Sequence, residues 1–318
     1  MSLSSQLRDP SSPVRKFFLV RVGDVRSIRR EWRSALAGAE TIRPITKQRP
    51  PYHTLGTALD YRIRFYFPSP PVASLIGARA ADYVRYDKIA DLLRAHTQAA
   101  EEFVSRHVRP GVKLTPTRER DLVRHCYVLA LGEEIYRAGA GIDSPLYRAS
   151  PRRGVGGLMS LVPDFAVDDL FALSRLFVKS QSALIGKPAE LNPSFIGSPV
   201  VNGADADLIV DGCLIDIKTT VSPRSLKVAS IFQLAAYAML DFVDEFGIDA
   251  VAFYMARQGV LVRFEVGEFF RMLTGERDVS LKTLRYDFSV ALLGGPKRPR
   301  QRVSDIATAG PIVKKRSR

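Results

Sequence analysis

The sequence contains few cysteines and few histidines. Two cysteines, Cys126 and Cys213, and four histidines occur among its 318 residues. Two thiols are too few for a disulfide framework, for a four-cysteine zinc site or for a cysteine-held iron–sulfur cluster. Four scattered histidines do not suggest a zinc site either. We therefore expect a protein of the reducing cytoplasm without an iron–sulfur cluster.

Long apolar runs are also missing. The longest strongly apolar run extends over the thirteen residues from Val228 to Leu240, and residues 1–13 contain no apolar core typical of a signal peptide. A helix that spans a bilayer needs roughly 20 apolar residues. The sequence therefore predicts a soluble protein that has no membrane partner.

The motifs of nucleotide-driven motors and of nucleophilic hydrolases are absent as well. The glycine-rich stretch from Gly154 to Gly157 is not followed by Gly-Lys-Ser or Gly-Lys-Thr, which excludes a phosphate-binding P-loop. Serine and histidine do not occur in an arrangement typical of a catalytic triad. The chain itself is therefore not expected to be an ATPase, a helicase or a serine hydrolase.

Positive charge is abundant and unevenly distributed. The net charge is +14; residues 1–50 hold eleven basic and four acidic residues, and residues 296–318 hold eight basic and one acidic. The intervening residues 51–295 are neutral overall. Cationic arms on a neutral body attract polyanions through counterion release, which favours nucleic acid as a partner. Basic tails that only aid solubility, or that touch ribosomes and anionic lipid non-specifically, are the alternative.

Helical periodicity dominates the first half of the chain, whereas the second half alternates between helical and β-like patterns. A turn-rich segment with Pro44, Pro50 and Pro51 covers residues 41–55. The elements predicted for the first half are a short strand over 16–22 and helices over 27–36, 73–84, 88–107 and 118–137. Those predicted for the second half are helices over 167–184 and 230–246 and strands over 195–201, 205–210, 213–219, 250–256 and 260–266.

This order predicts an α/β fold with a mixed central sheet flanked by helices, beside an α-rich N-terminal region. Residues 139–164 carry five glycines and several prolines, which indicates a linker or surface loop. We therefore place an α-rich region with a basic arm at residues 1–150 and a compact core at 151–290. The basic segment 291–318 is expected to be a disordered tail.

A hairpin in the second half carries the most informative pattern. Asp211-Gly212 lies between apolar residues, and this dipeptide favours a two-residue turn that needs positive φ at both positions. The turn sets the register, so that Asp207 would lie opposite Asp216. Because side chains alternate along a strand, Asp207, Asp216 and Lys218 would share one face of an otherwise apolar, half-buried sheet.

Carboxylates in such a cross-strand pair have Cβ atoms roughly 4.5–5.5 Å apart and repel each other unless a cation lies between them. Mg²⁺ prefers oxygen ligands and is often held by one or two carboxylates, with water and substrate phosphate as its other ligands. A lysine on the same face could orient or deprotonate an attacking water. The pattern is typical of metal-assisted phosphodiester hydrolysis, although an isolated Asp-x-Lys is more often a pair of ordinary strand-end charges.

Downstream, Gln233 and Tyr237 lie four residues apart, on one face of an otherwise apolar predicted helix. Alone, they suggest a tolerated polar position and a core tyrosine. A helix that follows the hairpin packs across the sheet, so both side chains could contact a bound strand or the lysine.

Together these residues resemble a known family. Asp207, Asp216-Ile-Lys218 and Gln233-Leu-Ala-Ala-Tyr237 look like the PD-(D/E)XK nuclease superfamily, in particular its RecB-like branch with a Gln-x-x-x-Tyr motif. The resemblance covers roughly residues 165–266, about a third of the chain. It implies a restriction-endonuclease-like core, Mg²⁺ or Mn²⁺ bound by Asp207 and Asp216, a catalytic Lys218, and substrate contacts from Gln233 and Tyr237. Asp205 is the second choice for the first aspartate.

The sequence departs from the family pattern in two respects. No proline precedes Asp207, and no spacing identifies the further acidic ligand that RecB-like enzymes commonly supply from an upstream helix or the first strand. Glu134 and Glu190 are our predicted additional metal ligands. Glu133 and His125 are further candidates, but a surface glutamate and an ordinary helix histidine are the simpler interpretations.

The resemblance implies a Mg²⁺-dependent nuclease, with DNA favoured over RNA by analogy, in repair, recombination or phage defence. Whether such an enzyme acts as an exonuclease or an endonuclease is left open. A non-catalytic nucleic-acid-binding or scaffold protein on a degenerate nuclease fold is one alternative. A nuclease subunit that is silent without a protein partner, such as a helicase or a defence complex, is another.

Overall fold

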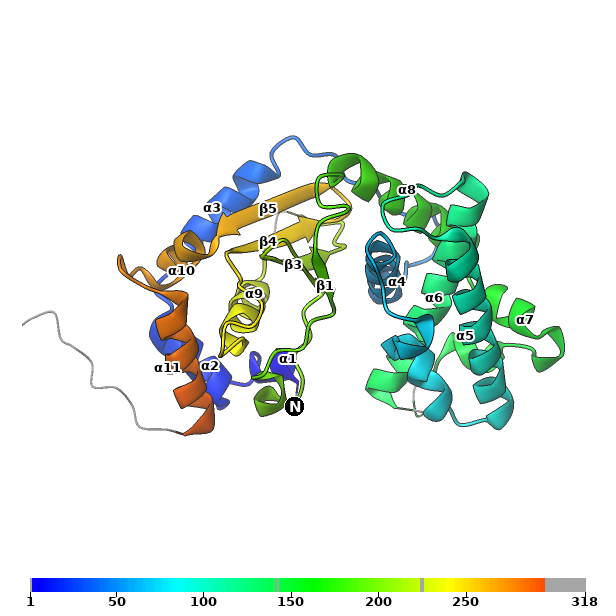
Figure 1. Ribbon diagram of the computed structural model, residues 1–318, viewed down its shortest axis with the longest axis horizontal. Helices are drawn as coiled ribbons and strands as arrows, with labels where there is room; N and C mark the ends of the chain where they lie inside the picture. Colours follow the sequence, from blue (N-terminus) through cyan, green and yellow to red (C-terminus); the bar gives the residue numbers. More distant parts are fainter. Residues whose placement is uncertain (1, 140, 142, 224–225, 295–318) are drawn as a thin grey trace, which may run out of the picture.

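The computed structural model describes residues 2–139, 141, 143–223 and 226–294. It has a helical half and a half built on a five-stranded mixed sheet (Figure 1). The predicted tail 291–318 lies outside the described residues, except for its first four positions. Within the part of the chain that is described, no helix has both the length and the apolar character needed to cross a bilayer.

Five α-helices and four short 3₁₀ helices form the helical half, which contains α4 between the sheet and α6 (Figure 1). Their bounds are α4 (Tyr52–Arg64), η1 (Val72–Ser74), η2 (Ile76–Asp82), α5 (Asp87–His107), α6 (Pro116–Ala138), η3 (Pro145–Arg148), η4 (Pro151–Arg153), α7 (Val155–Met159) and α8 (Asp164–Ser180). Helix α6 begins two residues before the predicted residue 118: Pro116 occupies its first turn, and the side chain of Thr115 accepts a hydrogen bond from the backbone N–H of Arg118.

Two glycines allow η2 to lie directly against α6. A Cβ atom on Gly77 would lie 2.1 Å from the carbonyl oxygen of Leu129, and one on Gly132 would lie 2.3 Å from the carbonyl oxygen of Gly77. Any side chain would therefore force the two backbones apart. This close approach holds α6 in place, and α6 in turn packs along α4.

The other half contains the sheet, whose strands are β1 (Ala189–Leu191), β2 (Leu208–Val210), β3 (Cys213–Lys218), β4 (Ala250–Met255) and β5 (Val260–Glu265). They lie in chain order, and all neighbours are antiparallel except β3 and β4. The parallel pair is connected through α9 (Val228–Leu240), as a crossover requires. The predicted mixed sheet with flanking helices is confirmed.

Both faces of the inner strands β2, β3 and β4 are largely buried, so the prediction of a half-buried sheet was wrong for the hairpin. Leu208, Ile215 and Tyr254 belong to the core shared with α4, α6 and α8, whereas Leu214 and Phe253 belong to the core shared with α9. The remaining helices of this half are α1 (Leu3–Gln6), α2 (Pro13–Arg21), α3 (Arg26–Ala35), η5 (Ser198–Val201), α10 (Val266–Thr274) and α11 (Leu281–Leu293).

The strand predicted over residues 16–22 is wrong, because these residues belong to α2. Ser12 caps that helix by accepting a hydrogen bond from the backbone N–H of Arg15, and Pro13 fits its first turn. Val14, Phe17 and Phe18 then fall on one buried helical face, whereas Leu19 and Val20 are exposed. The helical spacing of the buried residues outweighed the β-like composition.

Other segments also differ from the prediction, and helices α1, α7, α10 and α11 were not predicted at all. Residues 195–201 end in the 3₁₀ helix η5, and the first strand instead lies at 189–191. Residues 73–84 are mainly 3₁₀ rather than α-helical. Helix α4 was not predicted: its first four residues lie in the segment predicted to be rich in turns, and no element was predicted for the rest. Pro50 and Pro51 do not interrupt this helix, because both precede it and Pro51 is its N-cap residue.

The boundary proposed at residue 150 stays a prediction, and packing crosses it in both directions. The N-terminal helices α1 to α3 contribute Leu3, Phe18 and Trp32 to the core beneath α9. Helix α8, which follows the boundary, contributes Leu170 and Phe177 to the core of the helical half.

Candidate active site

The β2–β3 hairpin has the predicted turn and register. Asp211 and Gly212 both have positive φ, 50° and 76°, and the three paired positions run from Val210 opposite Cys213 to Leu208 opposite Ile215. Asp207 lies one residue before this ladder. Its Oδ2 atom accepts a hydrogen bond of 2.5 Å from the backbone N–H of Ile217, which fixes the carboxylate against the end of β3.

Asp216 and Lys218 form a buried ion pair at the same end of β3. Nζ of Lys218 lies 2.6 Å from Oδ2 of Asp216, and the side chain of Asp216 is 6% exposed. Within the described residues, this oxygen has no hydrogen bond of ordinary geometry. Burial raises the pKa of Asp216. Burial alone would lower the pKa of Lys218, but the neighbouring charges of Asp216 and Asp207 outweigh it and raise that pKa.

A third carboxylate, Asp60, comes from α4 in the helical half. Burial and then the charges of Asp60 and Asp216 raise the pKa of Asp207 to about 8. The pKa of Asp60 is itself raised, chiefly by burial, although its carboxylate is paired with the guanidinium of Arg64. Sequence analysis missed Asp60. The sequence does contain a pattern that could have identified it. Leu55, Leu59 and Ile63 recur at helical spacing, which predicts a helix with one buried face, and Asp60 is the one acidic residue of that helix.

A second glycine contact explains how α4 reaches the hairpin. A Cβ atom on Gly56 would lie 2.8 Å from Oγ1 of Thr219, the residue that follows β3. Between α4, the C-terminal part of α6 and the hairpin lies a polar cavity of about 250 Å³. Asp60, Asp205, Asp207 and Arg64 are among the residues that line it. Asp216 and Lys218 are not among the residues that line this cavity.

Gln233 and Tyr237 lie on α9, next to the same carboxylates. Nε2 of Gln233 donates a hydrogen bond of 2.9 Å to the hydroxyl of Tyr237 and one of 3.3 Å to Oγ of Ser4. Burial, and then the negative charges of Asp216 and Asp207, raise the pKa of Tyr237. The structure therefore brings together all five catalytic residues predicted from the sequence.

The candidate upstream ligands separate into two groups. Glu133 lines the cavity, where Tyr61 donates to it at 2.5 Å and Arg137 at 2.6 Å. Glu134 is not among the lining residues and instead accepts a hydrogen bond from Thr54.

Glu190 and His125 lie apart from the cavity. Glu190 is exposed on β1, opposite Ile209. His125 is buried, and its Nδ1 atom lies 3.1 Å from Nε2 of His96. In their present positions, no three acidic, histidine or cysteine side chains among the described residues are grouped closely enough to hold a metal ion by themselves.

The donor set nevertheless suits a hard divalent cation. Three carboxylates with raised pKa values converge at one end of the hairpin, and a buried oxygen of Asp216 lacks a good hydrogen bond. Mg²⁺ commonly takes only one or two protein carboxylates and completes its coordination with water and phosphate. Asp207 and Asp216 are the residues best placed to hold it, with Asp60 as the third acid.

Comparison with protein-family models, with curated proteins and with solved structures returned no match for this chain.

Proposed function

We propose that this protein is a divalent-metal-dependent nuclease whose active site lies at the end of the β2–β3 hairpin. The observation that carries the proposal is the meeting of Asp207, Asp216 and Lys218 with Asp60 from α4 and Tyr237 from α9. These residues come from the hairpin, from α9, which follows it, and from α4, which lies about 150 residues earlier in the chain. A merely structural hairpin would not need so many buried charges at one end.

The acidic residues would hold Mg²⁺ or Mn²⁺, with Asp60 in the place that we had predicted for Glu134 or Glu190. When bound, the ion would polarise a phosphodiester and lower the pKa of a coordinated water. The hydrogen bond from the Ile217 N–H keeps one oxygen of Asp207 fixed. The other oxygen of Asp207 would remain for the ion, together with the carboxylate of Asp216, whose Oδ2 atom also faces Lys218.

Lys218 acts as an ammonium rather than as a general base. Because its pKa is raised by the neighbouring carboxylates, it keeps its proton at neutral pH. An ammonium can orient an attacking water and offset the negative charge that develops on the phosphate, but it cannot remove a proton from that water. We therefore assign electrostatic and positioning roles to Lys218.

Gln233 and Tyr237 support this arrangement from α9. The amide donates to the phenol, so the hydroxyl hydrogen of Tyr237 is free to point toward the carboxylates or a phosphate oxygen. Arg137 lines the cavity, its side chain is half exposed, and its Nε atom donates to Glu133. It could receive a phosphate of the substrate.

The cationic N-terminal arm supports nucleic acid as the substrate. Arg29 on α3 donates to the carbonyl of Leu226 and Arg43 to that of Val221. Both carbonyls belong to the segment between β3 and α9, which follows Lys218. Hydrogen bonds therefore hold the basic segment close to the proposed active site. The choice of DNA over RNA as the substrate rests on the family resemblance alone.

The test is cleavage of labelled DNA by the purified full chain with Mg²⁺ or Mn²⁺. We expect Asp216→Asn to reduce cleavage to background, whereas Asp211→Asn should cleave like the wild type. Asp211 is an apt control because it lies in the same hairpin, is exposed and pairs with Lys187. Full cleavage by Asp216→Asn would refute the assignment.

Two other outcomes would favour the alternatives. If the wild type binds DNA but neither binds Mn²⁺ nor cleaves, the chain is a scaffold on a nuclease-like fold. If cleavage appears only after addition of a co-purified partner and is lost in Asp216→Asn, the chain is the nuclease subunit of a larger complex.

A further inference from the structure

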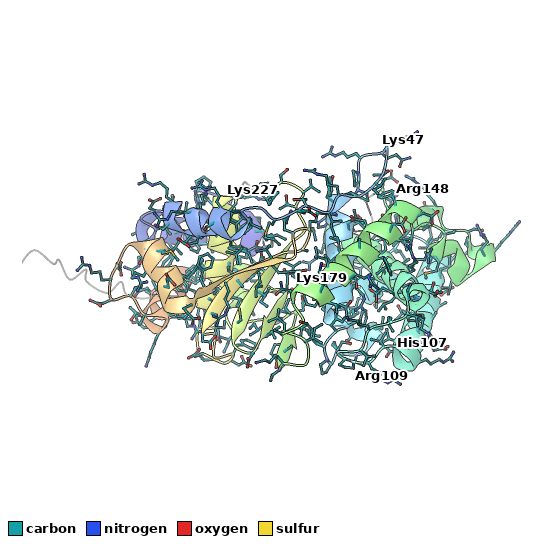
Figure 2. The ribbon with its side chains drawn as sticks, turned by 90° about the horizontal axis from the view of Figure 1, so that it is seen from above. Lys47, His107, Arg109, Arg148, Lys179 and Lys227 are labelled. Atoms are coloured by element: carbon teal, nitrogen blue, oxygen red, sulfur yellow. The ribbon has the colours of Figure 1, made fainter. Side chains whose placement is uncertain are left out.

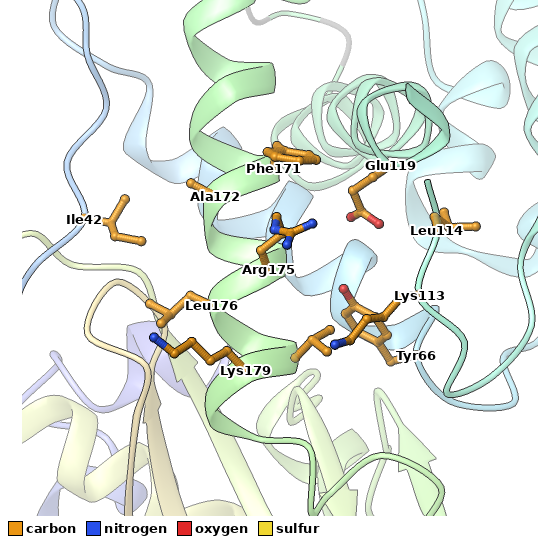
Figure 3. Close-up of a pocket in the computed structure, with 11 residues that line it drawn as sticks. Ile42, Tyr66, Lys113, Leu114, Glu119, Phe171, Ala172, Arg175, Leu176 and Lys179 are labelled. Atoms are coloured by element: carbon orange, nitrogen blue, oxygen red, sulfur yellow. The ribbon is translucent and has the colours of Figure 1, made fainter. Parts of the chain in front are cut away.

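The arginines of the helical half fall into two groups. Those around its second cavity, which has a volume of about 430 Å³, already have partners inside the protein. Arg62 donates to Glu119 and lies over the ring of Tyr66, while Arg175 lies against Phe171 and beside Glu119 (Figure 3). These side chains are engaged within the protein, so the cations that an external ligand could reach lie elsewhere on this half.

At the C-terminal end of α6, an exposed arginine and two tyrosines contact one another. The rings of Tyr83 and Tyr136 pack edge to face with their centroids 4.9 Å apart. The guanidinium of Arg79, which is exposed on η2, lies 5.2 Å from the centre of the Tyr136 ring. A guanidinium that stacks on a ring still has its N–H groups in its own plane, where they can donate to a phosphate.

The same arrangement is repeated a few residues further along the chain. Tyr86 packs edge to face against Tyr147 at 5.6 Å, and the guanidinium of Arg85 lies 5.3 Å from the centre of the Tyr147 ring. Tyr147 belongs to η3, which follows α6. We call the two sets together the tyrosine–arginine surface, which consists of Arg79, Tyr83, Arg85, Tyr86, Tyr136 and Tyr147.

Tyr83 and Tyr86 are the rings of this surface that solvent reaches most. They are 43% and 56% exposed, whereas Tyr136 and Tyr147, over which the arginines lie, are half-buried. Because the two exposed residues are three positions apart, their Cα atoms lie at most about 11 Å from each other. Two neighbouring planar groups of one ligand can therefore contact both rings.

Close backbone packing fixes this surface beside the proposed active site. Gly132 allows η2 to lie directly against α6, and Tyr136 follows it by about one helical turn. The next residue, Arg137, lines the polar cavity. The tyrosine–arginine surface and the cavity therefore share the end of one helix.

The start of α4 lies on the same side of the molecule. Figure 2 shows Arg148, at the end of η3, toward the same edge as Lys47, and it shows His107 and Arg109 toward the opposite edge. Lys47 lies shortly before α4, and Tyr52, the first residue of α4, is exposed and lines the cavity. An extended ligand on the tyrosine–arginine surface can therefore continue along this edge to the cavity.

Positive charge is concentrated on these segments. Residues 79–88 and 136–153 together hold seven basic and three acidic residues, although residues 51–295 are neutral overall. Such an excess attracts phosphates through counterion release. Helix α3 is also cationic, but its one aromatic residue, Trp32, is buried. It therefore offers cations without exposed rings.

The ligand must offer anionic groups and planar rings in one chain. In a duplex the bases are paired and stacked on one another, so they are not available to the exposed tyrosines, whereas a single strand offers each base to an aromatic side chain. We propose that the tyrosine–arginine surface binds single-stranded nucleic acid, with bases on Tyr83 and Tyr86 and phosphates on the arginines, and leads the strand to the polar cavity. This inference rests on the proposed nuclease function and specifies the form of its substrate.

The experiment measures binding of a fluorescein-labelled oligothymidylate to the full chain by fluorescence anisotropy, without divalent metal so that no cleavage occurs. We expect saturable binding by the wild type and binding at least about tenfold weaker, or ~1.4 kcal/mol, by Tyr83→Ala/Tyr86→Ala. Tyr83→Phe/Tyr86→Phe keeps both rings and should bind like the wild type. The matched control is Tyr286→Ala, which should also bind like the wild type, since Tyr286 is an exposed tyrosine on α11 in the other half.

An abasic strand of the same length separates stacking from a general change in the surface. The wild type should bind it more weakly than the oligothymidylate, and Tyr83→Ala/Tyr86→Ala should not weaken it further, because it has no bases to stack. Arg79→Gln should instead weaken binding of both strands by the same factor. It should also reduce the magnitude of the slope of log affinity against log salt by about 0.7.

Unchanged binding in Tyr83→Ala/Tyr86→Ala, an equal loss in Tyr286→Ala, or equal binding of the two strands by the wild type would each overturn the proposal. Absence of binding by the wild type would also overturn it and would assign the surface to a different partner, such as another protein. The nuclease assignment fails separately, through full cleavage by Asp216→Asn, and that result does not alter the metal-free binding comparison.

Discussion

Buried carboxylates occur in two very different settings in this molecule. In the structural setting, each one meets an arginine: Asp169 contacts Arg257 through two hydrogen bonds of 2.8 Å, and Asp241 contacts Arg285 at 2.9 Å. At the end of the β2–β3 hairpin, Asp207 and Asp216 instead share Lys218, and Asp60, which is paired with Arg64, adds a third buried carboxylate. In the first setting every carboxylate has its own arginine, whereas in the second three carboxylates share two cations.

The difference distinguishes a device for stability from a site for a ligand. A buried ion pair with good geometry is costly to break but needs nothing further. A cluster of carboxylates with raised pKa values costs stability at neutral pH and regains it when a cation binds. The two settings should therefore respond in opposite directions to removal of charge.

The largest effect is expected from breaking a completed pair. Arg257→Leu would leave Asp169 buried without its partner and would remove the hydrogen bond to the carbonyl of Thr219. We expect a loss of about 3–5 kcal/mol in the free energy of unfolding, measured by urea denaturation. Arg263→Leu is the control: its pair with Glu265 is exposed, so the loss should stay within about 1 kcal/mol. Equal losses in both variants would contradict the distinction.

The buried pair His96 and His125 is uncharged at neutral pH, and acidification tests how much this pair contributes to the pH dependence of stability. Burial lowers the pKa of His96 to about 3 and that of His125 to about 4. Unfolded histidines titrate near 6.5, so below that pH the unfolded state binds more protons than the folded state. Stability is therefore retained above about pH 6.5 and falls as pH decreases, by at most about 1.4 kcal/mol per unit for each histidine.

The measurement is urea denaturation at several pH values between neutral and acidic. The variant His96→Gln/His125→Gln should show a flatter decline than the wild type, because glutamine does not titrate. Comparing the two slopes cancels the contributions of the carboxylates. Parallel slopes would mean that the histidine pair is not the source of the acid sensitivity.

Removing charge from the incomplete cluster should have the opposite sign. Asp207→Asn keeps an oxygen for the Ile217 N–H but removes an ionisable carboxyl whose burial beside Asp60 and Asp216 costs stability at neutral pH. We expect the metal-free variant to be more stable than the wild type by about 1 kcal/mol, and to have lost cleavage. Added Mg²⁺ should raise the melting temperature of the wild type but not that of the variant. A destabilised, fully active variant would contradict both expectations.

The smallest effect is expected at Tyr237. Tyr237→Phe removes the hydroxyl that accepts the hydrogen bond from Gln233 while keeping the ring against Phe195. The stability loss should be about 0.5–1.5 kcal/mol. Cleavage should decrease without being abolished, which single-turnover assays at saturating Mg²⁺ would measure. Complete loss of cleavage would give Tyr237 a more direct role than the one assigned here.

How much of the site was predictable depended on distance along the chain. The Asp211-Gly212 turn and the pairing of Leu208 with Ile215 were predicted because turn geometry and strand alternation are local rules. Asp60 was missed because it lies about 150 residues from the hairpin, on a helix that the prolines before it obscured. Glu190 was predicted from proximity in sequence, yet its side chain is exposed on β1.

The sequence by itself determined the β2–β3 hairpin, its register, the placement of Gln233 and Tyr237 on one helical face, and the succession of one helix, three strands, one helix and two strands from α8 to β5. Each of these depends on residues within a few positions of one another. Only the tertiary structure decided that α4 lies against the end of β3, that α1 to α3 join the core shared with α9, and that Glu134 does not line the cavity. Those outcomes depend on which apolar surfaces bury one another and on where Gly56 permits close approach, and no local pattern contains that information.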